Sequence, residues 1–203
     1  KKHYLSLFKI LLLISIVIII FIGVQIFKMS NKVKKPKVSV ESTFSNETVS
    51  KKRQTLILDT TKGKIEIEML PSIAPKHVKR ISELVKNKFY DGIIFHRVIP
   101  DFMAQTGDPT GTGMSGSGEK IDAEFSDYEF IRGTVGMART SDPNSADSQF
   151  FICFLECSHL NNLYTVWGQV KKGLKTLDKI EPGEPPLKPD KIISAKIRTT
   201  KLK

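Results

Sequence analysis

Cysteine is scarce in this chain of 203 residues, which has only Cys153 and Cys157. Their C-x3-C spacing, followed by His159, fits no common zinc pattern, and the chain has no second pair of ligands to complete a zinc site. Cys153 lies in the apolar run of residues 149–154, which is typical of a buried thiol. The cysteines therefore argue against a metal site, and we expect no metal ligands among them.

Net charge is almost absent from most of the chain. The formal charge is +11, but residues 1–53 contain eleven Lys and Arg against two Glu and so account for +9 of it. The remaining 150 residues hold 21 basic and 19 acidic side chains. Because a nucleic-acid surface needs clustered positive charge, the near-neutral part of the chain is not expected to bind nucleic acid.

Long apolar runs are also missing, with one exception at residues 10–27. This stretch has no charged residue, and as a helix it would extend for about 27 Å, enough for a bilayer core. No convincing small-x-small cleavage site comes after it. We therefore expect a single-pass signal-anchor helix, with a basic head at 1–9, a flexible basic linker at 28–53 and a folded domain at 54–203.

The side of the membrane is not fixed by the charges. Lys1, Lys2 and Lys9 precede the apolar run and five lysines come after it, so a simple count favours a domain in the cytoplasm. An N-terminal anchor with a short basic head, however, commonly exports the domain attached to it. Our prediction is an inner-membrane protein with a periplasmic domain, and the cytoplasmic orientation is the alternative.

The folded part alternates short apolar runs with turn residues. Residues 55–60 and 64–70 predict a hairpin, residues 75–87 a helix with proline in its first turn, and residues 174–180 a second helix. Short β-patterns predict further strands at 93–99, 102–106, 133–138, 149–154, 164–170 and 191–198. About eight strands and two helices predict a mainly β domain with a closed antiparallel sheet.

One motif, at residues 111–116, has the spacing G-x-G-x-x-G of a dinucleotide-binding loop. That motif needs a strand before it and a helix directly after it, whose N-terminus holds the pyrophosphate. Residues 117–122 do not form a convincing helix. We therefore predict no nucleotide cofactor.

The most informative stretch is FHRVIPDFMAQTGD, residues 95–108. It holds no acid, base or nucleophile of an obvious hydrolytic set. Because side chains alternate along strands, Arg97 and Gln105 can rise from neighbouring strands onto one surface beside Phe102 and Met103. Such an apolar cup with fixed donors at its rim suits the binding and distortion of a neutral group.

This stretch resembles the signature of the cyclophilin-type peptidyl-prolyl cis-trans isomerases. Two further blocks are similar to that family in order and spacing: residues 133–153, with GTVGMA and DPNSADSQFFIC, and HLNNLYTVWG at residues 159–168. The resemblance extends from about Gln54 to the C-terminus. It implies an eight-stranded barrel capped by two helices, with isomerisation of X-Pro peptide bonds as its activity and no cofactor or metal.

The resemblance also implies the residues of the site. Arg97, Phe102 and Gln105 match the catalytic positions, with Arg97 stabilising a twisted amide and Gln105 bonding the substrate backbone. The expected substrate-binding residues are Met103, Ala138, Arg139, Phe151, His159, Leu160 and Tyr164. Arg139 replaces an Asn of some members and Tyr164 a His of many. His159 stands where cyclosporin-sensitive relatives have Trp, so cyclosporin is expected to bind weakly.

The expected partners are proline-containing unfolded or newly exported polypeptides, together with the membrane, and we expect a monomer. Two other functions stay open at this point. A holdase of the same fold could bind such chains without turnover, and a tethered scaffold could keep only a vestigial groove. The presence of both Arg97 and Gln105 favours the isomerase, because binding alone needs only the apolar walls.

Overall fold

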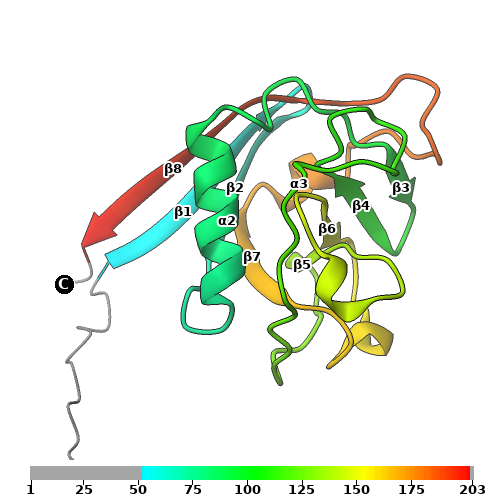
Figure 1. The fold of residues 1–203 in the computed structure, drawn as a ribbon. Coiled ribbons are helices and arrows are strands. Elements are labelled where there is room, and N and C mark those ends of the chain that lie inside the picture. Colours follow the sequence, from blue (N-terminus) through cyan, green and yellow to red (C-terminus); the bar gives the residue numbers. More distant parts are fainter. Residues whose placement is uncertain (1–51, 202–203) are drawn as a thin grey trace, which may run out of the picture. The chain divides into compact units, whose positions relative to one another are not determined.

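The computed structural model describes residues 52–201, and Figure 1 shows their fold. The predicted basic head, the apolar helix and the linker up to residue 51 lie outside this range. All described residues belong to one compact unit, Thr48–Lys203. Within residues 52–201, no helix is long and apolar enough to cross a membrane.

The described chain contains eight strands, two α-helices and two 3-10 helices. In order they are β1 (Lys52–Thr60), β2 (Gly63–Met69), α2 (Pro75–Lys86), β3 (Arg97–Ile99), β4 (Met103–Thr106), β5 (Thr134–Met137), η1 (Pro143–Ser145), β6 (Phe150–Cys153), η2 (Ser158–Leu160), β7 (Val166–Lys172), α3 (Leu174–Leu177) and β8 (Ile192–Lys201).

β1 and β2 form the predicted hairpin. Their register pairs Thr60 with Gly63, and Gly63 has a φ of 123°, which a residue with a side chain rarely adopts. In β2, Ile65, Ile67 and Met69 point inward between charged residues that face outward. The strict alternation in the sequence therefore corresponds to one buried and one wet face.

The eight strands form one antiparallel sheet in the order β3-β4-β6-β5-β7-β2-β1-β8. Strong twist curls it into a half-barrel, with β8, β1 and β2 beside α2 and with β3 and β4 at the far end (Figure 1). The prediction of a fully closed sheet is wrong for the described residues, because β3 and β8 share no ladder. The isolated bridges Ile94–Lys191 and Val98–Gly183 link these ends in place of a ladder, and the four prolines in residues 182–189 lack the N–H that a ladder needs.

α2 covers the main core. Pro75 sits in its first turn, and Val78, Ile81, Leu84 and Val85 form its buried face. They pack over a core that includes the fully buried Trp167, Phe150 and Tyr90. The spacing of the apolar residues thus predicted both the helix and the face that it buries.

The strand prediction for residues 93–99 is too long. Only Arg97–Ile99 pairs as β3, while Phe95 N–H donates to the carbonyl of Asp190 and Gly92 N–H to that of Ile192. Ile93 and Phe95 are both buried, as in a strand with one buried face. Their backbone groups, however, form hydrogen bonds with the irregular segment before β8 and with Ile192, the first residue of β8. The pattern therefore predicted burial correctly and the ladder incorrectly.

Candidate active site

The site is built on a row of residues that lie directly opposite one another across adjacent strands. Arg97 on β3 pairs with Gln105 on β4, Gln105 pairs with Phe151 on β6, and Phe151 pairs with Gly136 on β5. Opposite residues in antiparallel strands project to the same face of a sheet. The ladder therefore brings a guanidinium, an amide and an aromatic ring together on one surface, next to a position without a side chain.

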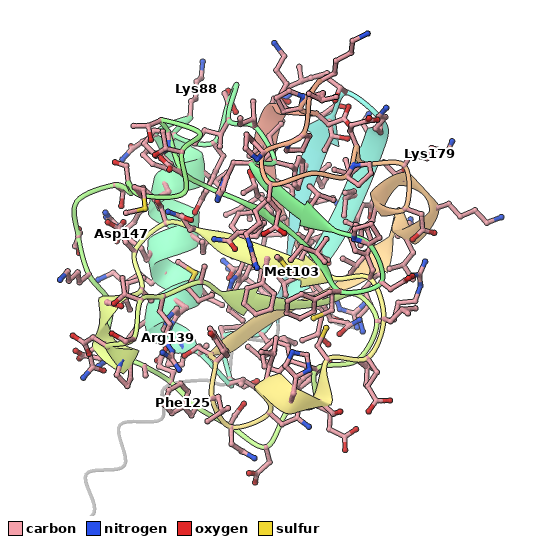
Figure 2. The ribbon with its side chains drawn as sticks, turned by 90° about the vertical axis from the view of Figure 1, so that its right-hand side faces the viewer. Lys88, Met103, Phe125, Arg139, Asp147 and Lys179 are labelled. Carbon is pink, nitrogen blue, oxygen red and sulfur yellow. The ribbon has the colours of Figure 1, made fainter. Side chains whose placement is uncertain are left out.

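A cavity of about 170 Å³ opens on this surface. Nine of the ten predicted site residues line it: Arg97, Phe102, Met103, Gln105, Ala138, Arg139, Phe151, Leu160 and Tyr164. The tenth, His159, packs against Phe102 with ring centroids 5.2 Å apart. In Figure 2, Met103 lies near the centre of this face and Arg139 below it.

The cavity has a rigid apolar wall. Phe151 stacks on Phe130 at 5.7 Å and meets the edge of Tyr164 at 5.7 Å. Phe151 and Phe130 belong to a small second core that also includes Met103, Cys153, Cys157 and Val166, all of them buried. Close packing of this kind limits side-chain movement, so the cavity keeps its shape.

The amide of Gln105 is oriented by its neighbours. Its Nε2 donates to Oε1 of Gln149 at 2.9 Å, and Nε2 of Gln149 donates to the carbonyls of Gly113 and Ser115 at 3.0 and 2.6 Å. This chain of bonds leaves the Oε1 atom of Gln105 without a protein donor among the residues described. The carbonyl side of the amide is thus the side available to a ligand N–H group.

Arg139 crosses the mouth of the cavity. Its guanidinium carbon lies 4.5 Å from the centre of the Tyr164 ring, a cation–π contact. Its Nη2 and Nη1 donate to the carbonyls of Leu163 and Thr140 at 2.9 and 2.8 Å. Across residues 52–201 no carboxylate pairs with it, so the mouth of the cavity carries a fixed positive charge.

Arg97 has a carboxylate partner that no sequence pattern predicts. Its Nε lies 2.7 Å from Oε2 of Glu184, which is 87 residues away. No other carboxylate of residues 52–201 pairs with Arg97, and Glu124 binds His77 instead. No local pattern marks Glu184, because the contact depends on how the ends of the sheet approach each other.

A second cavity of about 260 Å³ adjoins the first and shares Gln105, Ala138 and Arg139 with it. Its other walls come from the loop at 113–116 and from residues 140–149, including Asp147, which is labelled in Figure 2. An extended chain bound in one cavity can therefore pass over these three residues into the other. The loop with dinucleotide-like spacing is thus a wall of this second cavity.

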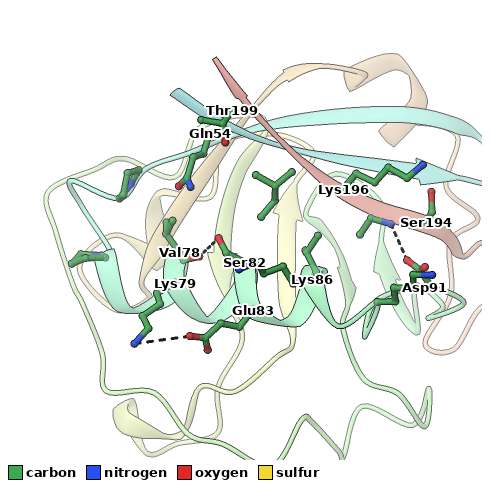
Figure 3. Close-up of a pocket in the computed structure, with 16 residues that line it drawn as sticks. Gln54, Val78, Lys79, Ser82, Glu83, Lys86, Asp91, Ser194, Lys196 and Thr199 are labelled. Carbon is green, nitrogen blue, oxygen red and sulfur yellow. Dashed lines mark hydrogen bonds and ion pairs between the residues drawn. The ribbon is translucent and has the colours of Figure 1, made fainter. Parts of the chain in front are cut away.

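A larger groove, of about 960 Å³, lies elsewhere, between α2 and the β1–β8 pair. Figure 3 shows Val78, Ser82 and Lys86 of α2 on one side and Lys196 and Thr199 of β8 on the other. None of the predicted site residues lines it. Volume alone therefore does not indicate where the chemistry takes place.

The two thiols do not form a reactive centre. Burial raises the pKa of Cys153 far above the ordinary value of a thiol, and burial also raises the pKa of Cys157. A thiol kept protonated is a poor nucleophile and a poor metal ligand. Cys153 is fully buried, as predicted from its apolar surroundings.

Comparison with known proteins places this chain in a family. The family model described as cyclophilin type peptidyl-prolyl cis-trans isomerase/CLD matches residues 55–197. The chain therefore belongs to the cyclophilin-type peptidyl-prolyl cis-trans isomerases, as the three sequence blocks predicted, and it is an isomerase of X-Pro peptide bonds.

Individual relatives agree. A probable peptidyl-prolyl cis-trans isomerase of Brucella suis is 47% identical over 161 residues, covering 70% of this chain and 82% of that protein. The human peptidyl-prolyl cis-trans isomerase-like 3 is 45% identical over 129 residues, covering 61% and 80%. A crystal structure of a Cryptosporidium parvum cyclophilin is similar with a TM-score of 0.68 and 30% identity, covering 72% of this chain and 98% of that one.

Proposed function

We propose that Arg97 catalyses isomerisation by stabilising the twisted amide of a proline held in the 170 Å³ cavity. A planar peptide bond resists rotation by about 18–20 kcal/mol, because the nitrogen lone pair is delocalised. When the bond twists, the nitrogen becomes pyramidal and can accept a hydrogen bond. A guanidinium close to it then gains more in the twisted state than in the planar ground state, which lowers the barrier.

The observation that carries this proposal is the row across the sheet. It aligns the guanidinium of Arg97, the amide of Gln105 and the ring of Phe151 on one face. A hundred-thousand-fold acceleration requires about 7 kcal/mol of differential stabilisation, which is more than one exposed hydrogen bond supplies. The apolar walls therefore have a catalytic part, because electrostatic interactions strengthen where water is excluded.

Gln105, in this proposal, binds a backbone N–H of the substrate through its free Oε1. The substrates would be proline-containing segments of unfolded or newly exported proteins, whose folding the enzyme assists. The structure of the Cryptosporidium parvum relative was also determined in the presence of the dipeptide Ala-Pro, with a TM-score of 0.67 and 31% identity to this chain. Proline as the group bound in the small cavity is consistent with that ligand.

The test of this mechanism is the isomerisation of an Ala-Pro-Phe peptide by wild type and Arg97→Ala. We expect kcat/KM to fall about a hundred- to a thousandfold, as when a single transition-state donor is removed. Arg198→Ala is the matched control, because Arg198 is also half-exposed and lies 2.7 Å from a carboxylate, that of Glu66. Full activity of a folded Arg97→Ala variant would refute the proposed role of Arg97.

A folded wild type that binds the peptide without accelerating its isomerisation would instead favour a holdase. That outcome is measured in the same experiment by titrating the peptide against wild type. The cavity walls alone are sufficient for such binding, whereas turnover depends on Arg97 and Gln105.

We further propose that residues 10–27 anchor the enzyme in the inner membrane and that its isomerase domain faces the periplasm as a monomer. The support is the uncharged apolar run in the sequence. Protease added to intact spheroplasts that express the full chain tests this orientation. Digestion of the domain is the expected result, and complete protection would indicate a cytoplasmic domain.

A further inference from the structure

Glu184 is the only residue among 52–201 that bonds the guanidinium of Arg97. Its Oε2 accepts from Nε at 2.7 Å, and the Nη1 and Nη2 groups have no protein partner in that part of the chain. A guanidinium has five N–H donors in a fixed fork, so holding Nε fixes the direction of the other four. The contact therefore orients Arg97 and leaves both Nη groups for a substrate.

The backbone places Glu184 beside Arg97 independently of this ion pair. Gly183 N–H donates to the carbonyl of Val98 at 2.9 Å, and Val98 N–H donates to the carbonyl of Gly183 at 2.8 Å. Since Val98 comes directly after Arg97 and Gly183 directly before Glu184, this reciprocal pair sets the two side chains next to each other.

The rest of the segment is held as well. Gly183 has a φ of 146°, and a Cβ there would lie 2.5 Å from Cα of Pro186, so only glycine fits this turn. Glu181 N–H donates to Oδ2 of Asp190 at 2.8 Å. Removal of the Glu184 carboxylate is thus expected to leave the path of this segment unchanged.

We propose that Glu184 is a positioning residue for the isomerase reaction, which holds Arg97 by its Nε and directs its Nη groups toward the cavity. This inference rests on the proposed catalytic role of Arg97. Both side chains are substantially exposed, 40% for Arg97 and 52% for Glu184, so their pairing adds little to the stability of the fold. We expect the pairing to affect the rate of isomerisation instead, because a freely rotating guanidinium samples the productive orientation for only part of the time.

Three variants test the proposal. Glu184→Ala is expected to lower kcat/KM about five- to tenfold, the size of effect that the loss of one ordinary solvent-exposed hydrogen bond produces. Glu184→Gln keeps an acceptor at the same place and should retain most of the activity. Glu181→Ala is the matched control, because it removes the same charge from the same exposed segment, and its side chain has no partner among the described residues.

Two readouts separate positioning from a general structural effect. The dissociation constant for the Ala-Pro-Phe peptide should stay the same in Glu184→Ala, since the apolar walls are intact, while kcat falls. The Arg97 Nε–Hε signal in an NMR spectrum should show faster exchange with water in Glu184→Ala and stay protected in Glu184→Gln.

A double-mutant cycle gives the decisive comparison. If Glu184 acts only through Arg97, Glu184→Ala has no further effect in an Arg97→Ala background. An equal additional loss in that background, or the same loss in Glu181→Ala, would overturn the proposal, as would full activity of Glu184→Ala. Failure of wild type to isomerise the peptide is a separate result, which counts against the proposed function itself.

Discussion

Gly136 shows how one missing side chain shapes the cavity. It lies opposite Phe151 in the ladder, and a Cβ at this position would be 2.5 Å from Cζ of Phe151 and 2.6 Å from Cε1 of Phe130. Gly136 therefore leaves room for the stacked pair of rings. The sequence shows a glycine at this position, but only the pairing of β5 with β6 shows that a side chain there would collide with the rings.

We predict that Gly136→Ala lowers kcat/KM even for the molecules that remain folded, in addition to lowering the free energy of unfolding. The new methyl group must displace Phe151 or Phe130, which changes the wall of the cavity, and overpacking of this kind costs about 1–3 kcal/mol of folding free energy. Both kcat/KM and the free energy of unfolding should be measured.

Gly168→Ala is the matched control for this prediction. A Cβ there would be 2.7 Å from Cγ2 of Ile67, in the main core and away from the cavity. We expect Gly168→Ala to lose stability while the folded fraction keeps its kcat/KM. Equal activity of both variants per folded molecule would contradict the argument about Phe151.

At the scale of elements, the N-terminus of α2 is held by a carboxylate from another part of the chain. Glu124 accepts from the backbone N–H groups of Lys76 and His77, each at 3.0 Å, and its Oε2 lies 2.7 Å from Nδ1 of His77. The first turn of the helix contains no acid of its own. Glu124 thus satisfies free N–H groups and supplies the negative charge that the helix dipole favours there.

The protonation states of this pair are set by burial. His77 is fully buried, and burial lowers its pKa more than the nearby carboxylate raises it. Burial alone would raise the pKa of Glu124, but the hydrogen bonds from His77 and from the backbone outweigh it and lower that pKa. At neutral pH a neutral imidazole therefore donates to an ionised carboxylate.

We predict that the domain loses stability as the pH falls below about 6.5, the pKa of an unperturbed histidine. In the unfolded state His77 binds a proton near that pH, whereas in the folded state it resists protonation. The unfolded state then holds more protons, so the free energy of unfolding decreases with falling pH. His96, whose pKa burial also lowers, adds a loss of the same sign in the same pH range. Glu124, whose pKa is lowered as well, adds a further loss at lower pH.

Urea unfolding from pH 8 to pH 4 measures this dependence. His77→Gln should show a smaller decrease between pH 7 and pH 5 than wild type, because it has no imidazole to protonate. Isomerase activity at a pH where both proteins remain folded should be alike, since His77 does not line the cavity. An unchanged pH dependence in His77→Gln would contradict the role given to this histidine.

At the scale of the whole molecule, the sequence predicted the features that depend on neighbours along the chain. The hairpin, the buried face of α2 and the gathering of nine site residues all appear as short-range patterns or as family blocks. The sequence did not predict the ion pair of Arg97 with Glu184 or the capping of α2 by Glu124, because each contact joins segments far apart in the sequence. The extent of β3 was missed for the same reason, since the residues before it bond to an irregular segment and to the start of β8.

The place of the cavity within the chain leads to a prediction for the molecule as a whole. All residues that line the cavity lie between positions 97 and 164, within the compact unit Thr48–Lys203. Such units generally fold independently, so residues 48–203 alone should keep kcat/KM for a short peptide within about twofold of the full chain in detergent.

The catalytic unit and the basic segment before it should also differ in how they respond to salt. Residues 28–53 contain eight Lys and Arg against two Glu, so a chain that begins at residue 28 and lacks the apolar run should bind vesicles that contain anionic lipid, and this binding should weaken as salt rises. The apolar cavity should make peptide isomerisation by residues 48–203 nearly independent of salt. A large loss of activity on removal of residues 1–47, with the remaining domain folded, would mean that the catalytic unit extends beyond the part that carries the cavity.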